Sequence, residues 1–102
     1  MTSTDEPIIV CAEIGNSDDK LTQARWAAFC QDTDDIIRFT AARIFGVRYS
    51  EPASEYQNAC WHFSVRPSEA GSLKAELAEN AAEYQQESIA WSQITQTEML
   101  TP

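Results

Sequence analysis

Thiol, imidazole and carboxylate groups occur at alternating positions in two short apolar segments of the chain. The first segment carries Cys11 and Glu13, and the second carries Cys60 and His62. A cysteine beside a histidine and a carboxylate can form an activated thiolate, and two cysteines with a histidine can hold zinc. The chain has one histidine, and it has no two cysteines separated by two residues, which is the spacing of strong zinc sites. We therefore assign no catalytic residue and no metal ligand, and we expect no cofactor.

A second group of polar side chains lies between the predicted strands and helices, and we call it the rim. Carboxylate and amide oxygens are the ligands that Ca²⁺ and Mg²⁺ take, so the rim could bind a cation or a polar ligand. The same residue types are favoured in turns, and the pair Asp18-Asp19 lacks the alternating pattern of a calcium-binding loop. Both interpretations remain open for the rim candidates Asn16, Ser17, Asp18, Asp19, Glu55, Gln57 and Asn58.

A third group is acidic. Four glutamates fall within a narrow arc of the second predicted helix, offset from its apolar stripe. This acidic ridge could dock a basic protein surface, and it could also be an ordinary solvated helix face, because glutamate is a good helix former. The ridge consists of Glu76, Glu79, Glu83 and Glu87.

Hydrophobic periodicity predicts six elements that would position these groups. Thr22 is placed to cap the first helix, and Pro67-Ser68 to begin the second. In the second strand we expect Phe45 and Val47 to face inward. The predicted elements are a strand over 7–14, a helix over 22–40, strands over 43–49 and 59–66, a helix over 67–86 and a strand over 88–94.

The order β-α-β-β-α-β predicts an α+β, ferredoxin-like fold, in which two helices cover one face of a four-stranded antiparallel sheet of order 4-1-3-2. We expect a single domain over 1–102, with an ordered core over 7–94 and flexible ends. In this topology Cys11 and Glu13 lie beside Cys60 and His62 on the uncovered sheet face. If they do no chemistry, we expect His62 and Glu13 to form a cross-strand pair. Cys30 falls on the buried stripe of the first helix.

Charge and composition exclude several classes of function. Seven basic residues against sixteen acidic ones give a net charge of −9, which repels phosphate backbones and favours basic partners. No phosphate-binding loop, dinucleotide fingerprint, metalloprotease motif or nucleophile elbow occurs in the sequence. We therefore expect neither direct nucleic-acid binding nor membrane insertion. Three cysteines and no secretory signal pattern lead us to expect a cytoplasmic protein.

Three segments carry a resemblance to known proteins. They run from Glu13 to Gln23 with Trp26 after it, from Gln57 to Trp61, and from Ser88 to Trp91. In them the chain resembles small uncharacterised proteins of actinobacteria and actinobacteriophages. That resemblance implies a source and no activity, cofactor or catalytic residue.

We therefore expect a non-enzymatic, acidic binding module, phage-encoded, that engages a host protein in the host cytoplasm through its acidic surface or its open sheet. The alternative is a small-ligand or metal-binding domain, with or without catalytic activity, that uses the rim or the open sheet face.

The open sheet face also bears on assembly. We expect it to carry Ile9 and Cys11 together with Ile89 or Trp91. An uncovered sheet with apolar residues tends to pack on a second sheet, which favours a homodimer through this face. In the competing arrangement, Met99 and Leu100 of the C-terminal tail fold back over it.

Overall fold

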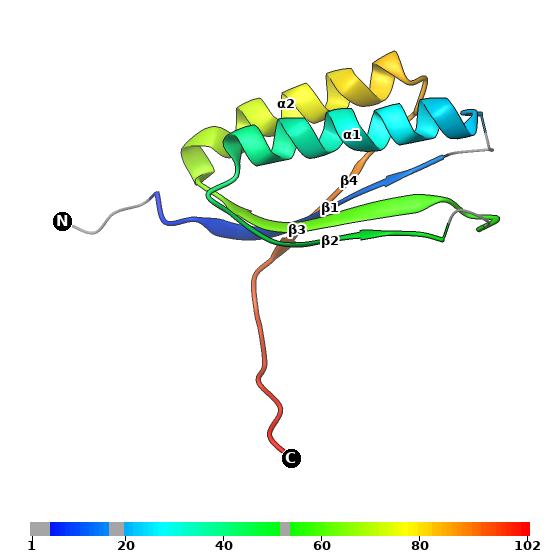
Figure 1. Ribbon diagram of the computed structural model, residues 1–102. Coiled ribbons are helices and arrows are strands. Elements are labelled where there is room, and N and C mark those ends of the chain that lie inside the picture. The colour runs from blue at the N-terminus through cyan, green and yellow to red at the C-terminus, as the bar shows by residue number, and fades with distance from the viewer. Residues whose placement is uncertain (1–4, 17–19, 52–53) are drawn as a thin grey trace.

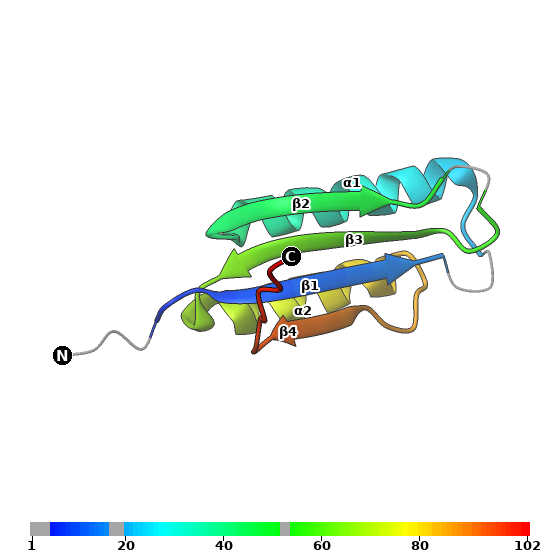
Figure 2. The same cartoon turned by 90° about the horizontal axis from the view of Figure 1, so that it is seen from below.

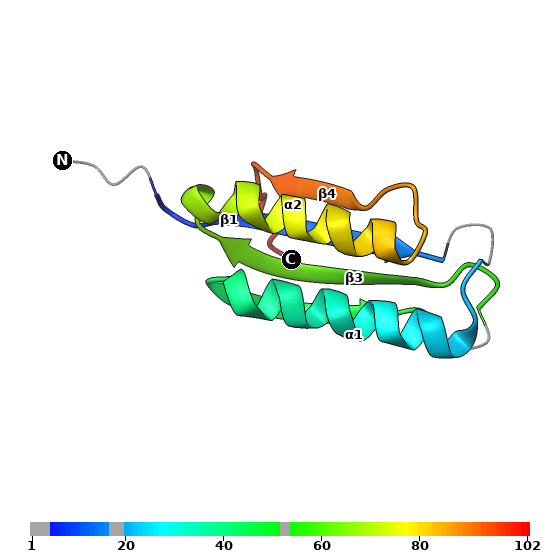
Figure 3. The ribbon, with the colours of Figure 1, turned by 90° about the horizontal axis from the view of Figure 1, so that it is seen from above.

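The computed structural model describes residues 5–16, 20–51 and 54–102. Two helices cover one face of a four-stranded antiparallel sheet of order β2-β3-β1-β4 (Figures 1 and 3). This is the predicted α+β architecture, with the predicted strand order. None of the described helices is long and apolar enough to cross a membrane. The elements in chain order are β1 (Ile8–Gly15), α1 (Gln23–Thr40), β2 (Arg43–Tyr49), β3 (Asn58–Val65), α2 (Pro67–Glu83) and β4 (Ala90–Ile94).

The core lies between the sheet and the helices. In the two central strands, β1 and β3, alternate residues point toward the helices, and Ala12 pairs with Trp61 while Val10 pairs with Phe63. All four of these side chains are fully buried. The two helices complete the core with Phe29, Ile37, Leu73 and Leu77. Cys30 is buried in the same cluster, as its position on the α1 stripe predicts.

Polar contacts fix how the two helices pack on each other. The side-chain amide of Asn80 donates to the Thr33 hydroxyl, which itself donates to the Phe29 carbonyl. One turn further along α2, the Tyr84 hydroxyl donates to Asp32, and the Tyr84 ring stacks on Phe29 with centroids 4.8 Å apart. Because a buried polar group without a partner costs free energy, these contacts favour this register of the two helices over shifted ones.

Helix α1 is also tied to the sheet by a polar contact. The indole N–H of the fully buried Trp61 donates to the Asp34 carboxylate at 2.9 Å. The other carboxylate oxygen of Asp34 pairs with Arg38 at 2.8 Å. Trp61 therefore fills the centre of the core without leaving its one donor unsatisfied.

The prediction that Phe45 faces inward is wrong. Ile44 pairs with Phe63 and Val47 pairs with Trp61, so both of these β2 residues face the helices. A β-bulge between Ile44 and Gly46 inserts one residue and reverses the alternation at that point. Phe45 is consequently turned to the open face, where it is 45% exposed.

Helix α2 begins at Pro67 as predicted, but its C-terminal end differs from the predicted one at residue 86. The helix ends at Glu83 because Gln85 takes a left-handed conformation with φ 59°, and the N–H groups of Gln85 and Gln86 return to the carbonyls of Ala82 and Ala81. This reversal is usually made by glycine, so the glutamine concealed the helix end. At the start of α2, the Asp5 carboxylate accepts hydrogen bonds from the backbone N–H and the hydroxyl of Ser68.

The last strand presents its faces in the opposite sense to our expectation. Trp91 pairs with Ala12 and lies on the helix side, where its ring meets Phe63 edge-on at 6.0 Å. Ile89 also packs against the core. The apolar β4 residue on the open face is Ile94, which pairs with Ile9.

The Trp61 contact yields a stability prediction. Asp34→Ala should lower the free energy of unfolding by about 1–3 kcal/mol, because it leaves a buried indole N–H without an acceptor. Arg38→Ala removes only the ion pair with Asp34 and should cost less than about 1 kcal/mol. Urea denaturation of both variants measures the difference. Equal losses would show that the Trp61 contact contributes nothing.

Candidate functional site

The open face of the sheet brings together the four residues that the sequence singled out. Cys11 lies directly opposite His62, and Glu13 lies directly opposite Cys60. All four alternate with the buried core residues of β1 and β3, so they lie on the sheet face away from the helices, the face that Figure 2 views. The expected cross-strand pair of His62 and Glu13 is therefore wrong, because the register sets them diagonally. The ring of His62 instead lies 5.1 Å from the ring of Phe45.

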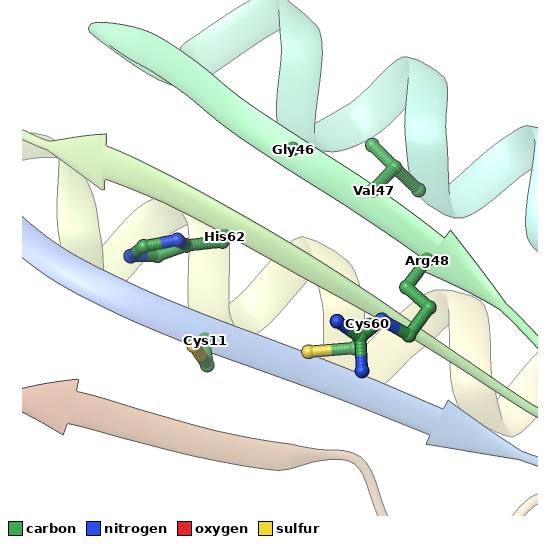
Figure 4. A pocket seen from close by; sticks show the side chains of 6 residues that line it. All are labelled: Cys11, Gly46, Val47, Arg48, Cys60 and His62. Carbon is green, nitrogen blue, oxygen red and sulfur yellow. The ribbon is translucent and has the colours of Figure 1, made fainter.

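Two shallow cavities mark this face. The first, of about 400 Å³, lies over β1, β3 and β2, and Arg48 and His62 are among its lining residues (Figure 4). The second, of about 410 Å³, lies beside it and is mostly apolar. Cys11, Gly46, Val47, Arg48, Cys60 and His62 line the first cavity, and Ile9, Phe45, His62, Ile94 and Thr97 line the second.

The Cys60 thiol on this face is not set up as a nucleophile. Burial raises the pKa of the Cys60 thiol, and the neighbouring Cys11 and Glu13 raise it further, while Arg48 acts in the opposite direction. A raised pKa keeps the thiol protonated at neutral pH, whereas a nucleophilic cysteine needs a lowered one. Cys30, inside the core, has its pKa raised to about 11 by burial. Among the described residues, no group of three or more His, Cys, Asp or Glu side chains could hold a metal ion.

Several rim candidates bind one another. The side-chain amide of Asn16 donates to Gln57 at 2.9 Å and to the Leu21 carbonyl at 3.0 Å. Gln57 in turn exchanges two hydrogen bonds with Gln23, at 2.8 and 3.2 Å. These three amides tie the β1–α1 connection to the β2–β3 connection, and Gln57 is almost fully buried. Their polar groups are used within the fold.

The remaining rim residues are dispersed. Asn58 closes the β2–β3 connection, because its backbone N–H donates to the Ser50 hydroxyl and its amide donates to the Tyr56 carbonyl. Glu55 is exposed beside it. Ser17, Asp18 and Asp19 lie outside the described residues.

Three of the four residues of the acidic ridge line a hollow beside α2. Glu76, Glu79 and Glu83 line a hollow of about 420 Å³ between the helices, together with Asn80 and with Ile36 of α1. We call this the acidic groove. Glu87 does not extend the ridge, because α2 ends four residues earlier.

Phe39 was missed by the sequence analysis. It lies one turn after Ile36 on α1 and is 91% exposed. Residues three apart on a helix are surface neighbours, so Phe39 lies next to Ile36, the apolar residue that lines the acidic groove. The available signal was its place outside the buried arc of α1, which identified it as an exposed aromatic residue.

The architecture is an α+β sheet with one covering helix layer, and solved structures share it. A crystal structure of a DUF3240 family protein from Shewanella baltica OS155 matches 98% of this chain and 100% of its own, with TM-score 0.51 and 13% identity. A solution structure of a hypothetical Arabidopsis thaliana protein matches 98% of this chain and 97% of its own, with TM-score 0.56 and 6% identity. These likenesses show the fold alone. No protein-family model and no curated protein matches the chain.

The Cys60 environment predicts slow thiol chemistry. Residue-resolved mass spectrometry of iodoacetamide labelling across a pH series should place the midpoint for Cys60 above that of the same cysteine in guanidinium-unfolded protein, because burial disfavours the thiolate. A midpoint at or below the unfolded value would identify an activated thiolate and would support a catalytic use of this face.

Proposed function

We propose that the protein is a non-enzymatic binding module whose helix layer docks a protein partner rich in basic residues. The observation that supports this most directly is the acidic groove, in which three glutamates and one isoleucine line a single hollow between α1 and α2. A hollow lined by three glutamates with one isoleucine fits a basic amphipathic helix, which can place an apolar side chain against Ile36 and its charges beside the glutamates.

The charge of the groove is not neutralised within the described chain. Across residues 5–16, 20–51 and 54–102, the one ion pair is Arg38 with Asp34. Lys74, the only basic residue of α2, directs its ammonium group to the ring of Trp91 at 5.1 Å. The groove glutamates therefore present uncompensated negative charge, which speeds the encounter with a basic partner and selects against acidic ones.

Phe39 supplies an apolar anchor next to this charge. Phe39 is 91% exposed, and an exposed aromatic side chain can carry binding energy when a partner buries it. Because the Phe39 side chain is exposed, replacing it should change the free energy of unfolding little. We therefore assign Phe39 and Ile36 to apolar contact and the three glutamates to charge recognition.

The resemblance to proteins of actinobacteria and their phages directs the search for the partner to a host of that group, with the module acting as a phage product in the host cytoplasm.

A second candidate function rests on the first open-face cavity. Arg48 and His62 there could orient a small polar ligand over the two thiols. Stabilisation of the wild type by a small polar compound, lost in Arg48→Ala, would favour this alternative, because a ligand that binds the folded state raises its melting temperature.

Capture from host lysate tests the docking function. Immobilised wild-type protein should retain a basic partner at low salt and release it as salt rises, because surface charges are screened within about 10 Å at 0.1 M ionic strength. Glu79→Lys/Glu83→Lys and, separately, Phe39→Ser should lose that partner. All three residues are exposed, so neither variant should disturb the fold.

The matched control is Glu51→Lys/Glu98→Lys, which makes the same change in net charge at exposed positions outside the helices. It should retain the partner. Equal recovery of the partner by the wild type and by both groove variants would show that the acidic groove does not bind it.

A further inference from the structure

We propose that the open face of the sheet is covered by a second copy of this chain, and that Met99 and Leu100 of each tail pack on the other copy. This interface lies on the side of the sheet opposite the acidic groove. The inference is independent of the docking function proposed above.

The apolar content of the open face supports a protein occupant. Ile9 and Ile94 pair across β1 and β4, and Phe45 lies on the same face because of the bulge in β2. All three line the second cavity, so they form one continuous patch. Burying exposed apolar surface of this kind favours association, because it removes apolar area from water.

The C-terminal tail leaves the sheet beside this patch and carries two exposed apolar residues. After β4 the tail passes Thr97, which lines the second cavity, and then points away from the sheet on the side opposite the helices (Figures 1 and 2). Met99 and Leu100 are each 84% exposed there. The arrangement in which these two residues fold back over their own sheet is therefore not the one observed.

The reach of the tail fits a second sheet. Packed sheets lie about 10 Å apart, and an extended chain advances about 3.3 Å per residue. The segment Glu98–Pro102 extends beyond Thr97 and can span about 17 Å, and along it Met99 and Leu100 lie about 7 and about 10 Å from Thr97, within reach of a second sheet. With a second copy in place, Met99 and Leu100 meet that copy instead of water.

The area of the face also indicates that the tail takes part. The strands contain eight, seven, eight and five residues. At about 3.4 Å per residue and about 4.8 Å between strands, they form a flat face of about 460 Å². A stable interface buries about 800 Å² per partner. Sheet-on-sheet contact alone falls short of this value, and the two apolar tails supply additional surface.

Charge sets the orientation in which a second copy can meet this face. Two chains of net charge −9 repel, yet the open face carries Arg43, Arg48 and Glu13 and none of the α2 glutamates. Meeting through the sheets therefore keeps the acidic helices on the two outer sides. In an interface with two-fold symmetry each patch meets itself, so Glu13 of one copy can face an arginine of the other.

Sedimentation of wild type and tail variant tests the proposal. The wild type should sediment as a dimer at tens of micromolar concentration. Met99→Ser/Leu100→Ser should raise the dimer dissociation constant at least about tenfold, because it removes two apolar side chains from the interface. Both residues are 84% exposed, so the variant monomer should have the melting temperature of the wild-type monomer.

The matched control is Phe39→Ser, which removes an equally exposed apolar side chain from the helix side and should leave the dissociation constant unchanged. Cys11→Arg, at the centre of the face, should sediment as a monomer and keep the circular dichroism spectrum of the folded protein. A monomeric wild type at these concentrations would overturn the proposal. A dimer that Met99→Ser/Leu100→Ser leaves unweakened would overturn the role of the tails and of this face.

Discussion

The arrangement of this chain depends on one constraint: a sheet has two faces, and a single layer of helices can cover one of them. The side chains of β1 and β3 alternate between the faces, so Val10, Ala12, Trp61 and Phe63 are buried under α1 and α2. The opposite set, which includes Cys11 and His62, is left on the other side. Any account of function has to say what meets each of the two outer surfaces.

The two outer surfaces differ in chemistry, and this difference separates their proposed roles. The helix layer carries an acidic groove beside an exposed phenylalanine, which suits a basic partner. The sheet face carries an apolar patch, a small number of opposite charges and the Cys60 thiol, whose pKa is raised, which suits packing more than reaction. A dimer through the sheets would present two acidic grooves on opposite sides, so that a partner with two basic segments could bind both.

Periodicity predicted the fold because every element buries one regular stripe or face. It failed where a local feature interrupts the period: the bulge at Phe45 in β2, and the left-handed Gln85 where glycine is usual. In β4, whose short sequence is apolar on both faces, only the pairing of Trp91 with Ala12 decides which side is inward. The open-face residues could be brought together from topology, because β1 and β3 are neighbours. The hydrogen bonds among the rim amides could not, since they depend on side-chain geometry across two connections.

The central claim is that the open face is an interface between two copies. Measuring intermolecular nuclear Overhauser effects tests it most directly. A sample is prepared by mixing isotope-labelled and unlabelled chains, and only contacts between copies are recorded. The account predicts cross-peaks from the methyl groups of Met99 and Leu100 in one copy to the residues of the Ile9, Phe45 and Ile94 patch in the other. A spectrum in which the tail methyl groups show no contact to another copy would contradict it.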